Sequence, residues 1–359
     1  MKYYYHKLLI KYNNTINKNI LIKNDEQLEK YLNDINEEYT LGIDTEFRRI
    51  DSYSPELCLI QIATKNQLEC IDILSINNLE PLFDKLYDGK TLWVIHSARQ
   101  DIEALYYLSG RIPSLLFDSQ IGASFLNYPL QVSYQVITEK LQNIFLDKKF
   151  TRFDWRKRPL PDDVLKYALD DVKYLLPNYR ILKKELINQA KLSWVEEEVQ
   201  FLLNKDTYEP NYKQIFNKTK GINKVSYKNQ NNAFKLLYWR ESVAQQKNKP
   251  RKWIMSDESV IDYANGKKKL SDSQNKLFEN FIKKSKLKVI PEDLLVVKKP
   301  LSESEKLLKN QLKNKINHLS NKYVIPSELI CSSKNLVKLI KGDNTKSILS
   351  GWRSELFKL

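Results

Sequence analysis

The first 110 residues alternate short apolar runs with amphipathic segments, and this alternation restricts the possible folds more than any other feature. Runs typical of β-strands lie at residues 19–22, 39–47, 57–64, 68–73 and 91–96. Apolar residues recur at helical spacing over residues 25–35, 79–87 and 99–108, and Gly110 suits the end of the last helix. Strands that alternate with helices predict an α/β domain with a mixed sheet.

The remainder of the chain is expected to be mainly helical. From residue 118 to about 202 the pattern is helical, with one helix starting at Pro161 and another over residues 176–187. Residues 204–229 are polar and aperiodic, which is typical of a linker. We therefore expect a first domain over residues 1–203, a linker over 204–229, and helical domains over 230–290 and 300–359.

Charge is distributed unevenly between the two halves. The chain has a net charge of +15, but residues 1–180 carry −2 and residues 181–359 carry +17. A basic half attached to a neutral one suggests a part that binds a polyanion. A general bias toward Lys and Asn is the alternative explanation, because both residues are abundant throughout.

Cysteine usage and hydropathy restrict the class of protein. The three cysteines, Cys58, Cys70 and Cys331, are too few and too scattered for a disulfide framework or a CxxC zinc site. No apolar run approaches the roughly 20 residues of a membrane helix, and the start lacks the apolar core of a signal peptide. We expect a soluble cytoplasmic protein.

The segment GIDTEF places two carboxylates side by side. In a strand, Asp44 and Glu46 lie on one face, while Ile43 and Thr45 lie on the other. At roughly 5 Å and an effective dielectric constant near 20, their repulsion costs about 3 kcal/mol. A bound cation or a solvated strand end would each relieve it, and this segment alone does not decide between them.

Two later segments carry similar groups. His96 and Asp101 span the end of a strand and the first turn of a helix, and Tyr167 and Asp171 share one helix face at i, i+4 spacing. Each group also has an ordinary structural explanation, since first-turn acids, core histidines and core tyrosines are common.

In order and combination, the three segments resemble the exonuclease motifs of the DEDD superfamily, in its tyrosine-containing branch. The blocks LGIDTEFRR, LCLIQIA, WVIHSARQDIEAL, FDSQIGASFL, TRFDWRKRPL and YALDDVKYLLP are similar to those of the ribonuclease D family, over about residues 40–180. The resemblance implies a ribonuclease-H-like (DnaQ-like) exonuclease domain, with a mixed five-stranded sheet flanked by helices.

The resemblance also implies the site. Asp44, Glu46, Asp101 and Asp171 match the four carboxylates that bind two divalent metal ions, Mg²⁺ or Mn²⁺, and such hard cations prefer oxygen ligands. Tyr167 matches the tyrosine that orients or deprotonates the attacking water. Its ordinary pKa near 10 favours orientation. His96 is expected beside the metal ligands or near a phosphate.

Several residues are expected to contact nucleic acid. Phe47 could stack on a terminal base, and a basic stretch with an aromatic side chain follows at Lys148, Lys149, Arg152, Trp155 and Arg158. Residues 230–290 resemble an HRDC domain, whose expected contacts are Trp239, Arg240, Lys247, Lys249, Arg251 and Lys252. Residues 300–359 resemble a second, more diverged HRDC-like segment. A solvated charged loop or an ordinary helical core would explain the same residues.

The expected function is a cytoplasmic 3′→5′ exoribonuclease that releases nucleoside 5′-monophosphates. The family resemblance implies trimming of the 3′ ends of precursor tRNA, with no membrane and no obligate protein partner. A DNA exonuclease of the same superfamily is an alternative, because the carboxylates do not read the sugar. A non-catalytic nucleic-acid-binding platform is another, although no expected catalytic position is substituted.

Overall fold

The computed structural model describes residues 20–147, 149–150, 153–285, 300–342 and 348–358. The chain divides into two compact units. The first comprises the described residues of Met1–Arg48, Leu57–Asn204 and Leu301–Leu359, and the second comprises those of Arg49–Glu56 and Lys205–Pro300.

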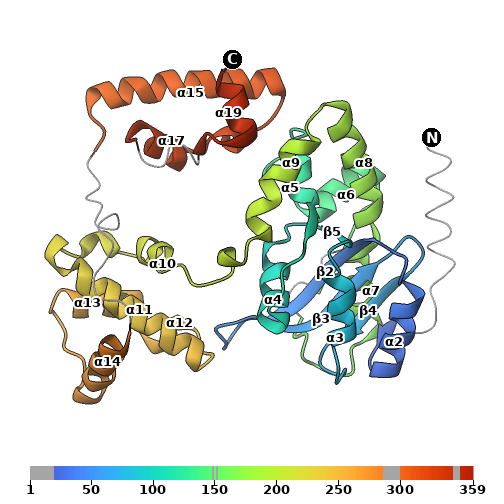
Figure 1. The fold of residues 1–359 in the computed structure, drawn as a ribbon, viewed down its shortest axis with the longest axis horizontal. Helices are drawn as coiled ribbons and strands as arrows, with labels where there is room; N and C mark the ends of the chain where they lie inside the picture. Colours follow the sequence, from blue (N-terminus) through green and yellow to red (C-terminus); the bar gives the residue numbers. More distant parts are fainter. Residues whose placement is uncertain (1–19, 148, 151–152, 286–299, 343–347, 359) are drawn as a thin grey trace. The chain divides into compact units, whose positions relative to one another are not determined.

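A mixed sheet forms the centre of the first unit (Figure 1). Its strand order is β1-β4-β3-β2-β5-β6. The bounds are Leu21–Ile22 (β1), Thr40–Arg48 (β2), Glu56–Ala63 (β3), Leu68–Asp72 (β4), Leu92–Ile95 (β5) and Leu115–Asp118 (β6). The described sheet thus has six strands rather than the five expected: the run at residues 19–22 forms the edge strand β1, which pairs in parallel with β4, and β6 was not among the predicted runs.

Strand directions explain how the carboxylate-bearing strand sits in the sheet. β2 runs parallel to β5, and β5 runs parallel to β6, with Ile95 opposite Asp118. β3 is antiparallel to β4. The seven residues between β2 and β3 are too few for a parallel crossover, which needs a dozen or more, so these neighbouring strands are antiparallel.

Helices pack on both faces of β2. The Thr45 side of this strand meets α4 (Arg99–Ser109), whose Asp101 accepts a hydrogen bond from Thr45. The opposite side meets α7 (Asp162–Lys173) and α8 (Leu175–Asn188), and Gly42 lies against Leu175 of α8. The predicted α/β domain is confirmed, and so is the alternation of faces along β2.

The other helices of the first unit are short, apart from α15. Their bounds are Asp25–Asp34 (α2), Glu80–Leu86 (α3), Ser119–Ser124 (α5), Tyr134–Gln142 (α6), Leu192–Glu198 (α9), Glu303–Tyr323 (α15), Ser327–Ile330 (α16), Ser333–Ile340 (α17) and Gly351–Lys358 (α19). Among the described residues, no helix combines the length and apolar character that a membrane span requires.

The C-terminal helices belong to the first unit rather than to a separate domain, which corrects the boundary expected from sequence. Trp352 of α19 stacks on Trp194 of α9 with ring centroids 5.2 Å apart. Its backbone N–H donates to Glu197, and Arg353 forms an ion pair with Glu198 at 2.8 Å. These aromatic and ionic contacts join segments about 150 residues apart in sequence.

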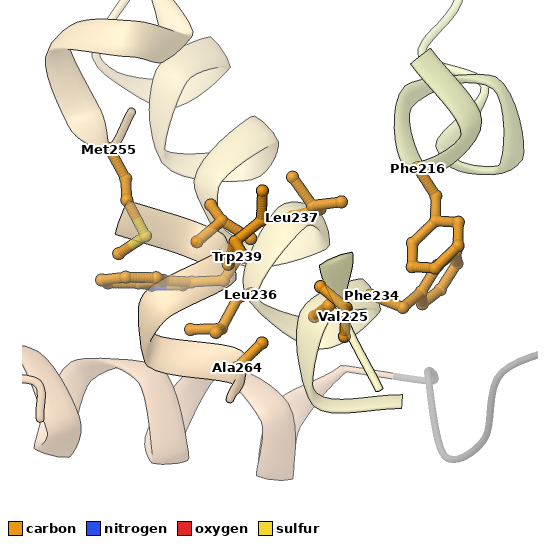
Figure 2. Close-up of a cluster of buried hydrophobic side chains, with 11 residues drawn as sticks. Phe216, Val225, Phe234, Leu236, Leu237, Trp239, Met255 and Ala264 are labelled. Atoms are coloured by element: carbon orange, nitrogen blue, oxygen red, sulfur yellow. The ribbon is translucent and has the colours of Figure 1, made fainter. Parts of the chain in front are cut away.

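The second unit is a small helical bundle with its own apolar core (Figure 2). Its helices are Tyr212–Lys218 (α10), Gln230–Gln246 (α11), Arg251–Ile254 (α12), Asp257–Ala264 (α13) and Asp272–Lys284 (α14). α11 supplies Phe234, Leu236, Leu237 and Trp239 to this core, and Met255 follows α12.

The expected linker over residues 204–229 is wrong. This segment holds α10 and short 3₁₀ turns, and its Phe216 and Val225 are buried in the core of the second unit. The prediction failed because the segment is mostly polar and its few apolar residues are spaced too irregularly to form a helical pattern.

The loop of residues 49–56 also packs within the second unit. The Tyr53 hydroxyl donates to Glu241 at 2.6 Å, and the backbone N–H of Tyr53 donates to Asn248. The sequence of this loop gave no indication of these partners, which lie almost 200 residues downstream.

Candidate active site

Three of the four predicted carboxylates converge. Asp44 and Glu46 project from the same face of β2, and Asp171 lies near the end of α7, which packs on that face. One oxygen from each lies within 4.8 Å of one from each of the other two. Among the described residues, this is the group of carboxylate, His and Cys side chains close enough to share a metal ion.

The fourth carboxylate, Asp101, is adjacent but turned toward a different partner. It is buried in the first turn of α4, and its Oδ1 accepts a hydrogen bond of 2.6 Å from the Thr45 hydroxyl. Its charge still reaches the cluster, because Asp101 contributes to raising the pKa of Asp44. The sequence predicted Asp101 but not its contact with Thr45.

Burial and mutual repulsion raise the pKa values of the clustered carboxylates, so they disfavour the ionised forms. Burial first, and then the charges of Asp101 and Asp171, raise the pKa of Asp44 well above its ordinary value. Burial, followed by the charge of Asp171, does the same for the pKa of Glu46. Burial raises the pKa of Asp171 to about 7, with the charge of Asp170 adding to it. A divalent cation would relieve this repulsion and favour the ionised carboxylates.

Tyr167 lies one helical turn before Asp171 on α7. Its half-buried ring contacts that of Phe150 with centroids 5.9 Å apart, beside an apolar cluster that includes Leu165 and Ala168. The ring is therefore held in place by packing.

Both ring nitrogens of His96 have partners outside the carboxylate cluster. Nδ1 lies 2.9 Å from the Ser119 hydroxyl, and Nε2 lies 2.9 Å from the carbonyl oxygen of Val132. Since a carbonyl only accepts, Nε2 carries the proton and Nδ1 accepts from Ser119. Burial lowers the pKa of His96. These bonds give His96 a structural role in joining β5 to α5 and the segment before α6.

Two supporting residues were not predicted from sequence. Asp118 accepts hydrogen bonds from the backbone N–H groups of Ser97 and Ala98, which hold the start of α4 in place. The hydroxyl of Tyr134 accepts from the backbone N–H of Tyr174, at the junction between α7 and α8. Asp118 could have been found as a cap residue, because it directly precedes the first turn of α5.

Comparisons with known proteins agree with this geometry. A family described as 3′-5′ exonuclease matches residues 19–187. The ribonuclease D of Bartonella henselae is 34% identical over 357 residues, covering 94% of this chain and 87% of its own length. That of Zymomonas mobilis is 31% identical and covers 88% of this chain and 86% of its own length.

The chain belongs to the ribonuclease D family of 3′→5′ exoribonucleases. The crystal structure of Escherichia coli RNase D, described as an exoribonuclease involved in structured RNA processing, is similar in fold, with a TM-score of 0.81 and 24% identity. The similarity covers 95% of this chain and 97% of that one.

The residues predicted to contact nucleic acid around this ribonuclease D site differ in their exposure. Phe47 is half-buried directly after the acidic pair, and Lys149 is exposed and forms an ion pair with Asp147. Lys148 and Arg152 lie outside the described residues.

The side chains of Trp155 and Arg158 make contacts within the protein instead. Trp155 is only 4% exposed and packs in the apolar cluster under α7. Arg158 forms two hydrogen bonds of 2.6 Å to Asp72 and another to the carbonyl oxygen of Cys58. The predicted contact with nucleic acid is therefore wrong for Trp155, and the guanidinium of Arg158 is already occupied.

In the second unit the same correction applies to Trp239 and Arg240. Trp239 is a core residue, and Arg240 is 1% exposed and forms an ion pair with Asp257 at 2.7 Å. Arg251 is exposed but forms an ion pair with the fully buried Glu241 at 2.9 Å.

Three of the predicted lysines lie on the surface of the second unit. Lys247, Lys249 and Lys252 are exposed. Trp253 directly follows Lys252 and was not predicted from the sequence; its side chain is 64% exposed, and the Lys249 ammonium lies 5.7 Å from its ring centroid.

Proposed function

We propose that this chain removes nucleotides one at a time from the 3′ end of RNA and releases nucleoside 5′-monophosphates. The observation that carries the proposal is the convergence of Asp44, Glu46 and Asp171 from β2 and α7, in a chain of the ribonuclease D family. Asp101 completes the proposed set, beside Asp44 and held by Thr45.

The donor set suits two divalent ions, Mg²⁺ or Mn²⁺. All the converging ligands are carboxylate oxygens, which such hard cations prefer, and burial followed by mutual repulsion raises the pKa values of Asp44 and Glu46. When bound, the ions would lower the pKa of the attacking water and stabilise the charge on the scissile phosphate.

The chain's own residues then supply position. Tyr167 shares a helix face with Asp171, and packing against Phe150 fixes its ring, so its hydroxyl orients the attacking water. A free phenol, with a pKa near 10, is a poor base at neutral pH, so orientation of the water is favoured over proton removal. Thr45 keeps the Asp101 carboxylate directed toward β2. His96 does not contact the substrate in this proposal; its hydrogen bonds to Ser119 and Val132 hold the elements around the cluster together.

We also propose that the second unit is an HRDC domain that holds RNA. Lys247, Lys249 and Lys252 would contact phosphates, and the exposed indole of Trp253 offers a surface on which an unpaired base can stack. Phe47, after the acidic pair, would stack on the terminal base. The substrates would be precursor tRNAs with 3′ trailers, and the setting would be the cytoplasm.

The test is a 5′-labelled single-stranded RNA incubated with Mg²⁺ or Mn²⁺, compared with a DNA strand of the same sequence. We expect stepwise shortening of the RNA and nucleoside 5′-monophosphates as products, with both abolished by EDTA and by Asp44→Asn. The matched control is Asp84→Asn, which changes an exposed carboxylate paired with Arg111 and should leave the rate unchanged.

Two outcomes would contradict the proposal. Faster degradation of the DNA strand would make the chain a DNA exonuclease. RNA binding by the wild type, without shortening at any metal concentration, would make it a non-catalytic platform.

A further inference from the structure

A buried glutamine lies beside Asp44 on the neighbouring strand. β2 and β3 are antiparallel, and a Cβ built on Gly42 would lie 3.2 Å from the Cβ of Ala63, so these two residues face each other on the α8 side. Two residues further along β2 is Asp44, and two residues back along β3 is Gln61. Because side chains alternate along a strand, Gln61 lies beside Asp44 on the same face.

Gln61 has no hydrogen-bond partner within the part of the chain that the structure describes. The residue is 0% exposed, and neither its Oε1 nor its Nε2 is paired. A buried amide normally makes several hydrogen bonds, and an unpaired one in a native structure calls for an explanation, such as an ion or a water molecule.

The neighbours of Gln61 narrow the possible partners. On its other side, β4 places Cys70 opposite Gln61. A thiol is only a weak hydrogen-bond partner, and Cys70 is itself fully buried. Across the sheet, on β2, the Asp44 carboxylate is a strong acceptor beside the amide.

We propose that Gln61 positions Asp44 for metal binding: when the cations are bound, its Nε2 would donate to the Asp44 carboxylate, the bond that its amide, unpaired among the described residues, does not make in this structure. The inference rests on the proposed function, because it assumes that the carboxylate cluster holds divalent ions. Hydrogen bonds to ligating carboxylates commonly fix their orientation, and removing such a partner typically lowers metal affinity 10- to 100-fold.

This role predicts two effects of opposite sign for Gln61→Met, which keeps the volume of the side chain and removes its polar atoms. Without metal, the variant should be as stable as the wild type or more stable, because an unpaired buried amide is removed. Its Mn²⁺ affinity should nevertheless fall about 10- to 100-fold.

The experiment measures Mn²⁺ binding by calorimetry and the thermal midpoint in EDTA, on the full chain. Tyr31→Phe is the matched control, because the Tyr31 hydroxyl of α2 is also buried without a partner among the described residues but lies outside the carboxylate cluster. It should match Gln61→Met in stability and the wild type in Mn²⁺ affinity. In kinetics at saturating RNA, Gln61→Met should require more Mn²⁺ for half-maximal rate, with KM for RNA unchanged.

Wild-type Mn²⁺ affinity in Gln61→Met would overturn the inference and leave the proposed function intact. If the wild type itself bound no Mn²⁺, the proposed function would fail instead. Should Gln61→Met not fold, Gln61→Asn provides the second arm: it keeps the amide but shortens its reach, and we expect a smaller loss of Mn²⁺ affinity. Unchanged affinity in that variant would also count against the role.

Discussion

Buried charge is treated in opposite ways in the two units. In the second unit, the buried Arg240 pairs with Asp257, and the buried Glu241 accepts from both Tyr53 and Arg251. In the first unit, the carboxylates of the cluster face mainly one another, and their pKa values are raised.

The difference separates structural charge from functional charge. A buried charge paired with an opposite one fixes geometry, whereas like charges gathered in a half-buried site reduce stability until a cation binds. This comparison explains why the acidic cluster marks the proposed active site, while the Arg240 and Glu241 pairs mark the interior of a bundle.

The largest expected effect comes from Asp44→Asn. Loss of a metal ligand should lower kcat on the order of 10³-fold, equivalent to about 4 kcal/mol of transition-state stabilisation. In EDTA the same variant should be more stable than the wild type by roughly 1 kcal/mol, because a repelling charge is removed. Kinetics and urea unfolding measure the two effects. A variant that lost both activity and stability would contradict the distinction drawn above.

Next in size is the effect of breaking a paired buried charge. Arg240→Ala should lower the free energy of unfolding by about 3–5 kcal/mol, because it removes the partner of Asp257 and leaves space in the core. Arg111→Ala removes an exposed pair with Glu80 and should cost about 0–1 kcal/mol. Urea unfolding followed by circular dichroism tests both. Equal effects of the two variants would show that burial does not govern these pairs.

Without metal, the free energy of unfolding should decrease as the pH rises, because of the carboxylate cluster. Folding raises the pKa of Asp101 and Asp171 to about 7, from an ordinary value of 3.8. The folded state therefore binds protons more tightly than the unfolded state, so the stabilisation is complete below about pH 4 and is lost as the pH rises through 7. We expect this contribution to fall by several kcal/mol over that range.

The measurement is the unfolding free energy in EDTA from pH 5 to pH 8, repeated in Mg²⁺. Mg²⁺ should restore stability most strongly at pH 8, where the carboxylates are ionised. Asp44→Asn should flatten the pH profile. A wild-type profile that rose with pH in EDTA would mean that these carboxylates gain their stability from positive partners.

Sequence reasoning predicted the elements whose pattern is local. The two-residue period placed Asp44 and Glu46 on one face of β2, and the i, i+4 spacing placed Tyr167 and Asp171 on one face of α7. It did not predict β6, because this four-residue strand runs directly into α5.

Ion pairs and hydrogen bonds between residues far apart in the chain could not be predicted from the sequence. In a basic half of the chain, Arg240 and Arg251 resemble phosphate contacts, and only the fold shows that Asp257 and Glu241 already pair with them. Likewise, the Thr45–Asp101 bond links residues 56 positions apart, and no spacing rule announces it.

The smallest expected effect concerns the surface of the second unit. Trp253→Ala should weaken binding of single-stranded RNA by about 1–3 kcal/mol, because the base that stacks on the indole loses its partner. Trp253→Phe should recover part of this loss, since a phenyl ring still stacks. Lys252→Ala should instead reduce the salt dependence of binding by about one phosphate contact. Fluorescence anisotropy with Asp44→Asn as background measures binding without degradation. If Trp253→Ala changed only the salt dependence, the indole would serve to hold Lys249 in place, and the base would stack elsewhere.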